Sequence, residues 1–532
     1  MKILVAEKVS SSALKALQEP GWVVVTPEEC AGKLPELLAD ADALLVRSAV
    51  KVDAALLEHA GKNLRVIGRA GVGVDNVDLD AATRKGIAVM NTPGANAVAV
   101  AEHTMLLMLA MARHLCKANA LLHAGKWEKK SLQGTELRGK KLGVLGLGKI
   151  GMEVARRAVA FDMEVIGYDP FVSPLVAREK GIRLAELNEV LGTADYLTLH
   201  MALTPQTDGL INAETLAQMK KGVRIVNCAR GELIKEADLA EAVKSGQVGA
   251  AAIDVFIVEP PKDSPLLGLE NVIVTPHLGG STNEAQEAVG VQIAMQVKEY
   301  LKHGVIQNAV NVPSVSYEEY VDMQPFMVLA ERMGRLLAQL SDGHPEEVNL
   351  RYSGRLTEWK TDLMRNAVLK GLLDGTLHDP VNVVNAAAMA DAAGVRVHES
   401  KRESAAGGKE DVLALTLKTS KGESEVRGTV LHGRSPRLLH VNGTDIEAPL
   451  GNQLIYLRNR DVPGVIGRVG TLLGQHQINI GNFSLGRRDE ATQPDGVREA
   501  VALLDVDSPA SEAVIAALRA IEPVLEARSL RL

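Results

Sequence analysis

Short apolar runs alternate with helical patterns through the first part of the chain. The apolar runs are KILVA, WVVVT, DALLVRS, LRVIGRA and IAVMN. Segments between them, such as SSALKAL and LDAATRKG, place apolar residues at the spacing of one helix face. Strands that alternate with helices are typical of a parallel α/β sheet. We therefore predict such a sheet for the first part of the chain.

A long apolar segment, NAVAVAEHTMLLMLAMARHLCKANALL, follows at residues 96–122. The pattern predicts one continuous helix. A helix that is apolar on all sides is expected to be buried. We therefore expect this helix to lie between domains or between subunits.

A second alternating series begins after this helix. Its apolar runs are LGVLGLG, MEVIGYD, DYLTLHM, RIVNCAR, AAIDVF and NVIVTPH. They predict a second parallel α/β sheet, with a glycine-rich turn after its first strand. The pattern is helical again from residue 281 to about residue 303, and residues 309–316 are interpreted as a linker.

The last 200 or so residues have a different character. Helical patterns cover residues 325–341 and 358–375, and EVNLRYSG is typical of a strand. VLALTLKT, EVRGTVL, PRLLHVNG and TDIEAPL suggest an antiparallel sheet, so this part is predicted to be an α+β domain. From residue 452 the predicted order is βαββαβ, which is ferredoxin-like.

Composition narrows the class of protein. A chain of 532 residues is too long for one core, so three or four domains are expected. The net charge of −7 argues against general binding to nucleic acid or to an anionic membrane. No apolar run approaches the roughly 20 residues that span a bilayer, and the opening MKILVAEKVS is too short for a signal peptide. Cys30, Cys116 and Cys228 are too few and too scattered for a disulfide framework or a zinc site. We expect a cytoplasmic enzyme without a metal.

The stretch VLGLGKIG, at residues 144–151, has the G-x-G-x-x-G spacing of a dinucleotide-binding turn. Gly146 allows the tight turn, Gly148 lets the backbone approach the pyrophosphate, and Gly151 lets the helix pack. The next strand ends in Asp169, about where a carboxylate binds the adenosine ribose. This acidic residue favours NAD over NADP, because it would repel a 2′-phosphate. Alternatively, Asp169 opens the turn before Pro170, and both roles are compatible.

Polar residues follow three strands of the second series, where ligands bind in doubly wound sheets. His277 is a candidate base for the proton of a hydroxyl group. Glu259 is a candidate partner that orients the imidazole, and Arg230 suits a bidentate pair with a substrate carboxylate. Asp254 is a candidate for the nicotinamide carboxamide, and Cys228 is expected to pack near the cofactor. Taken singly, the arginine reads as a surface charge, the glutamate as part of a loop and the histidine as a core residue.

Several stretches between residues 40 and 310 resemble the D-2-hydroxyacid dehydrogenases. They are VRSAVKVD, GRAGVGVDNVDLDAATRKGIAVMNTPGANAVAVAEHT, GTELRGKKLGVLGLGKIG, GVRIVNCARGELI, AAIDVFIVEPP and TPHLGGST. The stretch RDVPGVIGRVGTLLGQHQINIGNFSLGR resembles an ACT domain. The chain thus resembles the long type of this family, which carries an intervening regulatory domain before a terminal ACT domain.

The resemblance implies two doubly wound domains with Rossmann- or flavodoxin-like parallel sheets, followed by an α+β domain and a ferredoxin-like ACT domain. It implies a discontinuous substrate-binding domain at residues 1–98 and 287–316. It also implies an NAD-binding domain at 99–286, an intervening domain at 317–450 and an ACT domain at 451–532.

Site residues follow by position. The resemblance implies Arg230, Glu259 and His277 as the catalytic trio. The implied NAD contacts are Gly146, Gly148, Lys149, Ile150, Gly151, Asp169, Cys228, Asp254, Gly279 and Gly280. The implied substrate contacts are Val72, Gly73 and Asn96 for the carboxylate and hydroxyl group, and Arg47 and Arg69 for a phosphate.

The implied activity is NAD-dependent oxidation of 3-phospho-D-glycerate (3-phosphoglycerate) to 3-phosphohydroxypyruvate, at the start of L-serine biosynthesis. One alternative is a reductase of glyoxylate or hydroxypyruvate, which would leave Arg47 and Arg69 without an anionic partner. Another is a non-catalytic, NAD-sensing corepressor, against which the ACT segment speaks.

Regulation and assembly are also expected. An exposed ACT sheet edge favours edge-to-edge pairing, and serine is the expected effector, bound across the pair by Asp461 and Asn479. Gly464 lets the backbone approach the same pocket. In the alternative interpretation, Asp461 only caps the following helix. The apolar helix at 96–122 suggests a homodimer through the NAD-binding domains, and the resemblance implies a homotetramer.

Overall fold

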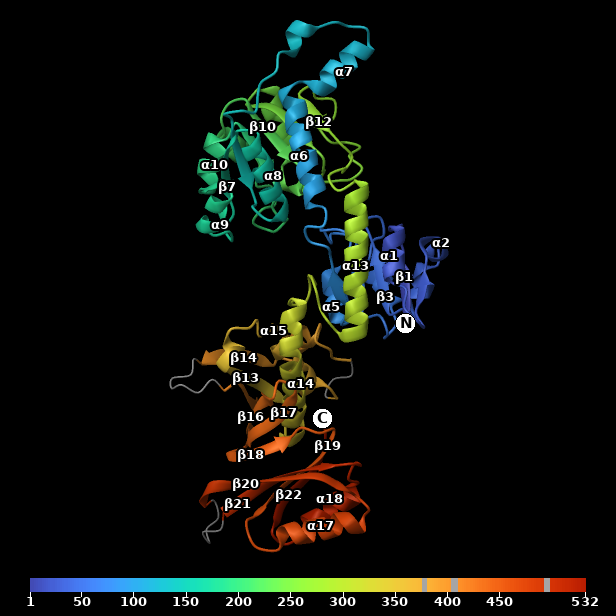
Figure 1. Cartoon of the computed structure of the whole chain (residues 1–532), viewed down its shortest axis with the longest axis vertical. Helices are drawn as coiled ribbons and strands as arrows, with labels where there is room; N and C mark the ends of the chain where they lie inside the picture. The colour runs from blue at the N-terminus through green and yellow to red at the C-terminus, as the bar shows by residue number, and fades with distance from the viewer. Residues whose placement is uncertain (376–379, 403–409, 492–497) are drawn as a thin grey trace.

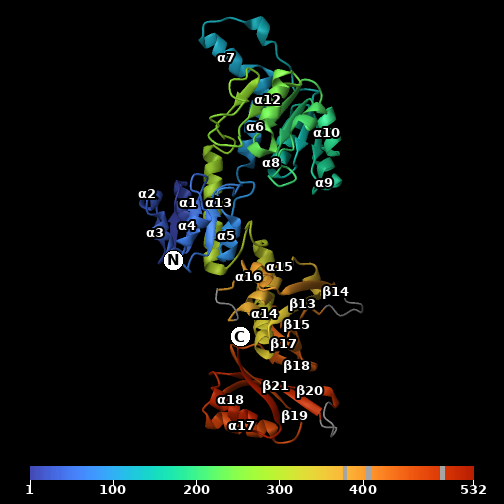
Figure 2. The same cartoon turned by 180° about the vertical axis from the view of Figure 1, so that it is seen from behind.

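The described part of the chain forms four β-sheets that follow one another along the longest axis of the molecule (Figure 1). The structure is a computed structural model that describes residues 1–375, 380–402, 410–491 and 498–532. The seven-stranded sheet lies at one end and the four-stranded sheet at the other, and the view from behind shows the same order (Figure 2).

The first sheet has five parallel strands in the order β2-β1-β3-β4-β5, as the alternation of strands and helices predicted. The strands are β1 (Lys2–Val5), β2 (Val23–Val25), β3 (Ala43–Val46), β4 (Val66–Arg69) and β5 (Ala88–Met90). The helices between them are α1 (Ser11–Ala16), α2 (Pro27–Cys30), α3 (Leu34–Leu38), α4 (Ala54–Glu58) and α5 (Leu79–Arg84).

The helix predicted from residue 281 is α13 (Asn283–His303), which returns the chain to the first sheet (Figure 1). It packs directly against β4. A Cβ atom added to Gly68 would lie 2.8 Å from Cγ1 of Ile293, so only glycine allows this close contact. This return is the topology that a discontinuous first domain requires, although its boundaries stay a prediction.

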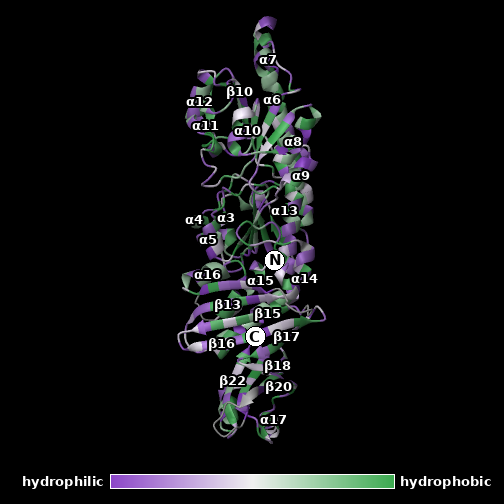
Figure 3. Ribbon diagram, turned by 90° about the vertical axis from the view of Figure 1, so that its left-hand side faces the viewer, coloured by the Kyte–Doolittle hydropathy of each residue, from purple (hydrophilic) through white to green (hydrophobic). Residues whose placement is uncertain are grey.

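The prediction of a single helix at residues 96–122 is wrong, because the segment forms two helices. They are α6 (Ala97–Ala112) and α7 (Leu115–His123), separated by His114 at a φ angle of +51°. A residue in the left-handed region cannot continue a right-handed helix. Within the single chain α6 is largely buried, whereas α7 has no buried residue and projects from the end of the molecule opposite the four-stranded sheet (Figure 3). Burial of α7 between subunits stays a prediction.

Among the described residues, no single helix combines the length and the apolar character needed to cross a membrane. The pair α6 and α7 meets that criterion only when the two helices are taken together, and they are bent by 63° relative to each other.

The second sheet has seven parallel strands in the order β12-β11-β10-β9-β6-β7-β8. The strand order reverses between β6 and β9, so the glycine-rich turn after β6 lies at the topological switch point, where doubly wound sheets bind ligands. The strands are β6 (Lys141–Leu145), β7 (Glu164–Tyr168), β8 (Arg183–Leu184), β9 (Tyr196–Leu199), β10 (Val223–Asn227), β11 (Val248–Ile253) and β12 (Val272–Val274). The helices are α8 (Lys149–Ala160), α9 (Pro174–Glu179), α10 (Leu187–Thr193), α11 (Ala213–Ala217) and α12 (Glu236–Lys244).

The third sheet has six strands and is mixed. The predicted antiparallel strands pair as expected, and β13 and β14 add a parallel pair at one edge. The elements are α14 (Tyr317–Leu340), β13 (Pro345–Ser353), α15 (Asp362–Leu373), α16 (Ala386–Ala392), β14 (Arg396–Arg402), β15 (Val412–Thr419), β16 (Gly422–Leu431), β17 (Ser435–Val441) and β18 (Thr444–Pro449).

The first helix of this part begins earlier than the predicted residue 325. Ser316 and Glu319 form a capping box, in which the N–H of each residue donates to the side chain of the other. The helix then continues through Pro325. The prediction missed the start of the helix, which includes buried Met323, because the first turn is polar.

The fourth sheet is antiparallel and has the predicted βαββαβ order, with strands arranged β20-β21-β19-β22. Its elements are β19 (Gln453–Arg460), α17 (Val465–Gln475), β20 (Ile480–Ala491), β21 (Arg498–Val506), α18 (Glu512–Arg519) and β22 (Val524–Arg531).

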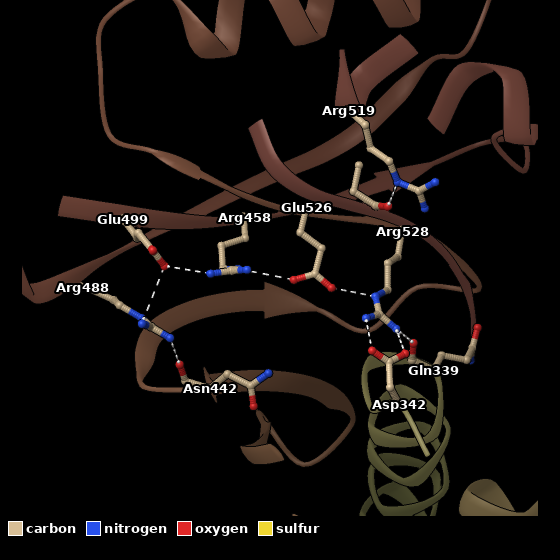
Figure 4. Close-up of polar contacts among 10 residues, drawn as sticks. Gln339, Asp342, Asn442, Arg458, Arg488, Glu499, Arg519, Glu526 and Arg528 are labelled. Carbon is tan, nitrogen blue, oxygen red and sulfur yellow. Dashed lines mark hydrogen bonds and ion pairs between the residues drawn. The ribbon is translucent and has the colours of Figure 1, made fainter. Parts of the chain in front are cut away.

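Polar contacts join the third and fourth sheets (Figure 4). Arg528 on β22 lies 3.4 Å from Asp342, just after α14, and Arg488 on β20 donates to the carbonyl oxygen of Asn442 at 2.7 Å. Further ion pairs within the fourth sheet connect Arg458 with Glu499 and Glu526. The two sheets are therefore linked by charged side chains as well as by the chain itself.

Candidate active site

The glycine-rich turn has the geometry that its sequence predicted. Gly146 has a φ angle of +92°, and a Cβ atom there would lie 2.6 Å from the carbonyl oxygen of His200. A Cβ atom at Gly151 would collide with the carbonyl oxygen of Gly146. At Gly148 a Cβ atom would meet nothing within 4 Å, so the N-terminus of α8 faces open space. Free N–H groups at such a terminus suit a pyrophosphate.

Lys149 and Ile150 form the first turn of α8. A Cβ atom at Gly94 would lie 2.8 Å from Cδ of Lys149. The lysine side chain thus extends from the second sheet toward the segment that connects the two sheets. Its contact with the cofactor stays a prediction.

Asp169 follows β7 and lies against the glycine-rich turn. Its Oδ2 accepts a hydrogen bond from the N–H of Leu147 at 2.8 Å, and its Oδ1 accepts one from the N–H of Phe171 at 2.8 Å. The second bond is the turn-opening role considered from the sequence. A carboxylate has about four acceptor sites, so it retains capacity for ribose hydroxyl groups.

His277 and Glu259 are paired. Nδ1 of His277 lies 2.9 Å from Oε2 and 3.1 Å from Oε1 of Glu259. The imidazole is 53% exposed and the carboxylate 40% exposed. His277 is therefore not a buried core histidine, and its Nε2 is left for another partner.

Arg230 reaches from the second sheet across to the first. Its Nε donates to Oδ2 of Asp75 at 3.1 Å, and its Nη1 donates to the carbonyl oxygen of Ala229 at 2.7 Å. A Cβ atom at Gly73 would collide with Nη2 of this arginine. The structure thus brings Arg230 together with Gly73, a predicted substrate contact. Sequence analysis missed Asp75, although it lies in the glycine-rich loop at residues 68–76.

The other predicted carboxylate and hydroxyl contacts surround this loop. The carbonyl oxygen of Val72 accepts a hydrogen bond from Nδ2 of Asn91 at 2.6 Å. Oδ1 of Asn96 is buried without a hydrogen-bond partner. A Cβ atom at Gly280 would lie 3.1 Å from Nδ2 of Asn96. Among the described residues, Oδ1 of Asn96 is thus an unpaired acceptor, and its amide nitrogen lies against Gly280.

The predicted phosphate contacts are cationic, and among the described residues no ion pair joins either side chain to a carboxylate, although Asp75 and Glu7 lie near enough to act on the charge of Arg69. Burial, together with the charge of Arg230, lowers the pKa of Arg69, and its Nε has no hydrogen-bond partner. Arg47 lines a cavity of about 320 Å³ that Lys8 also lines. Lys8 follows the first strand in a segment without a recognisable motif. Sequence analysis therefore did not identify it as a candidate phosphate contact.

Asp254 is 0% exposed and is surrounded by donors. Burial raises its pKa, but hydrogen bonds from His103, Thr275 and the N–H groups of residues 278 and 279 outweigh burial and lower it. A Cβ atom at Gly279 would lie 3.2 Å from Oδ2 of Asp254, so this glycine of the predicted cofactor contacts packs against the carboxylate.

Cys228 lies beside this carboxylate. Burial raises the pKa of its thiol to about 12, which disfavours a nucleophilic thiolate. The ligating atoms of Cys228, Asp254 and His103 lie within 4.8 Å of one another, the spacing of a possible metal site. Sequence analysis did not single out His103.

The two predicted effector residues do not meet within one chain. Asp461 pairs with Arg487 at 2.9 Å and lines a cavity of about 270 Å³ with Gly464. Asn479 donates to Asp507 at 2.7 Å and does not line that cavity. The alternative that Asp461 caps α17 is wrong, because Gly464 is the N-cap and no side chain caps the helix.

Three protein families match the chain in consecutive segments. The NAD binding domain of the D-isomer specific 2-hydroxyacid dehydrogenases matches residues 105–279. The intervening domain of D-3-phosphoglycerate dehydrogenase matches residues 322–442, and the ACT domain matches residues 454–523.

Similar proteins extend over the whole chain. The D-3-phosphoglycerate dehydrogenase of Methanocaldococcus jannaschii is 44% identical over 522 residues, which cover 98% of each chain. That of Bacillus subtilis is 36% identical over 527 residues, which cover 99% of each. Among solved structures, a glyoxylate reductase from Paecilomyes thermophila is 31% identical, with a TM-score of 0.54, and covers 58% of this chain and 98% of its own. The TT0316 protein of Thermus thermophilus is 35% identical, with a TM-score of 0.53, and covers 58% of this chain and 100% of its own.

Proposed function

The chain belongs to the D-3-phosphoglycerate dehydrogenase family, and from this premise we propose how its own residues carry out the reaction. The enzyme oxidises 3-phospho-D-glycerate to 3-phosphohydroxypyruvate with NAD, in serine biosynthesis. The assignment of the catalytic residues rests on the His277–Glu259 pair and on the position of Arg230 beside Gly73, a predicted substrate contact.

His277 is the base in this proposal. Its Nε2 takes the proton of the C2 hydroxyl group, while Glu259 stabilises the imidazolium that forms. The 2.9 Å contact between Nδ1 and Oε2 holds the ring in the tautomer that leaves Nε2 unprotonated before the reaction. Bound NAD would supply the acceptor for the hydride that leaves C2. The reverse reaction uses His277 as the acid.

Arg230 binds the substrate carboxylate, because a guanidinium offers two parallel N–H groups to a carboxylate. Gly73 makes room for Nη2 of Arg230, so the guanidinium lies against the loop that contains Val72 and Gly73. The free Oδ1 of Asn96 accepts a hydrogen bond from the cofactor or the substrate hydroxyl group.

The described residues fit NAD. The open N-terminus of α8 at Gly148 accepts the pyrophosphate, and Asp169 accepts hydrogen bonds from the ribose hydroxyl groups. Cys228 and Asp254 lie beyond the carboxyl ends of β10 and β11, on the nicotinamide side. The carboxylate of Asp254 binds the carboxamide there.

Arg47 and Arg69 bind the substrate phosphate. Arg69 ends β4 and Arg47 directly follows β3, and neither side chain has a carboxylate ion-pair partner among the described residues. A phosphate supplies the missing anion, whereas glyoxylate has no group to place there. The two cations thus account for selection of a phosphorylated substrate.

Domain boundaries and assembly follow from the same premise. The substrate-binding domain comprises residues 1–98 and 287–316, and the NAD-binding domain 99–286. The remaining domains are the intervening domain at 317–450 and the ACT domain at 451–532. The exposed side chains of Leu115, Leu122 and Trp127 on and after α7 support a dimer through the NAD-binding domains, and ACT pairing makes it a tetramer. Free Cys116 is exposed, which suits the reducing cytoplasm.

Serine is the proposed effector and slows the enzyme. Asp461 binds the serine ammonium group in the cavity at the start of α17, where Gly464 leaves the backbone accessible. Because Asn479 lies outside that cavity within one chain, its contribution comes from the paired ACT domain of a second copy.

One experiment tests catalysis and regulation together: NADH oxidation with a panel of 2-oxo acids, with and without serine. Phosphohydroxypyruvate should be reduced most efficiently. Failure to turn it over would contradict the residue assignments in the active site. Serine should inhibit the wild type and Glu512→Gln, an exposed control on α18, but not Asp461→Ala. Equal inhibition of Asp461→Ala would move the site elsewhere, for example to residues 317–450, and absence of binding by calorimetry would exclude serine.

A further inference from the structure

The imidazole of His103, on α6, lies beside Asp254, whose carboxylate binds the turn that carries His277. Its Nε2 lies 3.3 Å from Oδ1 of Asp254 and 3.3 Å from Oγ1 of Thr275. The side chain is only 13% exposed. The same helix begins directly after Asn96, the predicted substrate contact. One helix thus extends from the segment between the two sheets to the carboxylate of Asp254.

Asp254 organises the turn that carries His277. Its carboxylate accepts hydrogen bonds from the N–H groups of Leu278 at 2.7 Å and Gly279 at 2.8 Å. Its carbonyl oxygen accepts one from the N–H of His277 at 2.9 Å. His277 adopts a φ angle of +55°, a conformation that non-glycine residues disfavour. The surrounding bonds must therefore maintain it.

Two side chains, those of Thr275 and His103, also contact the Asp254 carboxylate and hold its orientation. Oγ1 of Thr275 donates to Oδ1 at 2.6 Å, and Nε2 of His103 approaches the same oxygen. Burial disfavours a charged carboxylate unless donors compensate it. The other buried residues of α6 are mainly apolar. If position 103 served packing alone, an aliphatic residue would be expected there.

We propose that His103 is a positioning residue that donates from Nε2 to Asp254 and thereby holds the turn of His277 in its reactive orientation. The inference rests on the proposed role of His277 as the base. Within the described part of the chain, the imidazole of His103 contacts Asp254 and Thr275, and no contact with His277 is present. It acts through Asp254, whose carboxylate also faces the predicted carboxamide of the cofactor.

The test compares His103→Leu with His103→Gln in the full-length enzyme. Glutamine can place an N–H donor near the position of Nε2, whereas leucine fills similar space without a donor. His103→Leu should lower kcat about tenfold and weaken NADH binding in a fluorescence titration, with a melting temperature close to that of the wild type. His103→Gln should recover most of both losses. The control is Glu102→Gln, the neighbouring exposed residue that faces Arg157, which should change neither.

A double-mutant cycle separates this inference from the function on which it rests. In the His277→Ala background and at saturating NADH, His103→Leu should lower kcat no further, because the base that it positions is gone. An undiminished second loss, or equal defects in His103→Leu and His103→Gln, would overturn the positioning role. If His277→Ala alone keeps the wild-type rate, the assignment of the base fails, whatever the His103 variants show.

Discussion

Nε of Arg230 donates to Oδ2 of Asp75 across 3.1 Å, and this ion pair connects the second sheet with a loop of the first. The arginine is 27% exposed and the aspartate 66% exposed. The contact uses Nε and leaves Nη2 beside Gly73, where the substrate carboxylate is expected. Oδ2 of Asp75 lies beside the same glycine, so Asp75 orients the guanidinium at the predicted substrate contact.

The first prediction concerns that orientation. Asp75→Ala should lower kcat/KM for phosphohydroxypyruvate roughly fivefold, because a partly exposed ion pair contributes about 1 kcal/mol or less. Asp75→Asn keeps an acceptor for Nε and should lose less. Steady-state kinetics of both variants measure the difference. Identical losses would show that charge, and not orientation, is the contribution of Asp75.

The second prediction concerns the base. His277→Ala should reduce kcat roughly a hundredfold or more, which is the contribution of a positioned acid–base group. Glu259→Gln keeps a hydrogen-bond acceptor but loses the charge that stabilises the imidazolium, so its loss should be about tenfold smaller. Single-turnover measurements of NADH oxidation isolate the chemical step. An unchanged rate for His277→Ala would contradict the assignment.

The third prediction concerns the phosphate. Arg69→Ala should raise KM for phosphohydroxypyruvate about tenfold or more, because a hydrogen bond to a charged group contributes about 1.5–3 kcal/mol. Hydroxypyruvate, which lacks the phosphate, should be much less affected. Arg65→Ala is the matched control, since this arginine pairs with Asp42 at 3.5 Å on the same sheet. Equal losses on both substrates would mean that Arg69 supports the fold.

The fourth prediction concerns the cofactor. Asp169→Ser should reduce the preference for NADH over NADPH at least tenfold, because it removes the charge that repels a 2′-phosphate. The ratio of kcat/KM values for the two cofactors measures it. Glu164→Gln, at the opposite end of β7, should leave the ratio unchanged. A wild-type enzyme that uses both cofactors equally would contradict the role of Asp169.

The fifth prediction concerns acid stability. Burial lowers the pKa of His200 from 6.5 to about 3. The unfolded chain therefore binds a proton below pH 6.5 that the folded chain does not, and stability falls as the pH decreases through this range. At pH 5.5 the free energy of unfolding should be lower than at pH 7.5 by an amount on the order of 1 kcal/mol. His200→Gln should show a smaller decrease in melting temperature between pH 7.5 and pH 5.5 than the wild type, whereas exposed His123→Gln should match the wild type.

The sequence by itself determined the types of secondary structure and the positions of the catalytic candidates along the chain. Alternating strands and helices require parallel sheets, and the carboxyl ends of parallel strands share one edge. The sequence therefore predicts Arg230, Glu259 and His277 at the same edge as the cofactor turn, and the structure pairs His277 with Glu259. The spacing of glycines likewise determined the turn at Gly146, because its conformation is a local property of the backbone.

Only the tertiary structure decided the contacts between elements that lie far apart in the sequence. The pairing of Arg230 with Asp75 and the approach of His103 to Asp254 each depend on how helices and sheets pack, and apolar periodicity carries no information about a single polar partner on another element. The break at His114 was hidden for a related reason, since an apolar pattern continues through one left-handed residue. Asn479 lies outside the cavity that Asp461 lines. The sequence predicts the strand or helix on which each residue lies, but only packing determines which side chains meet.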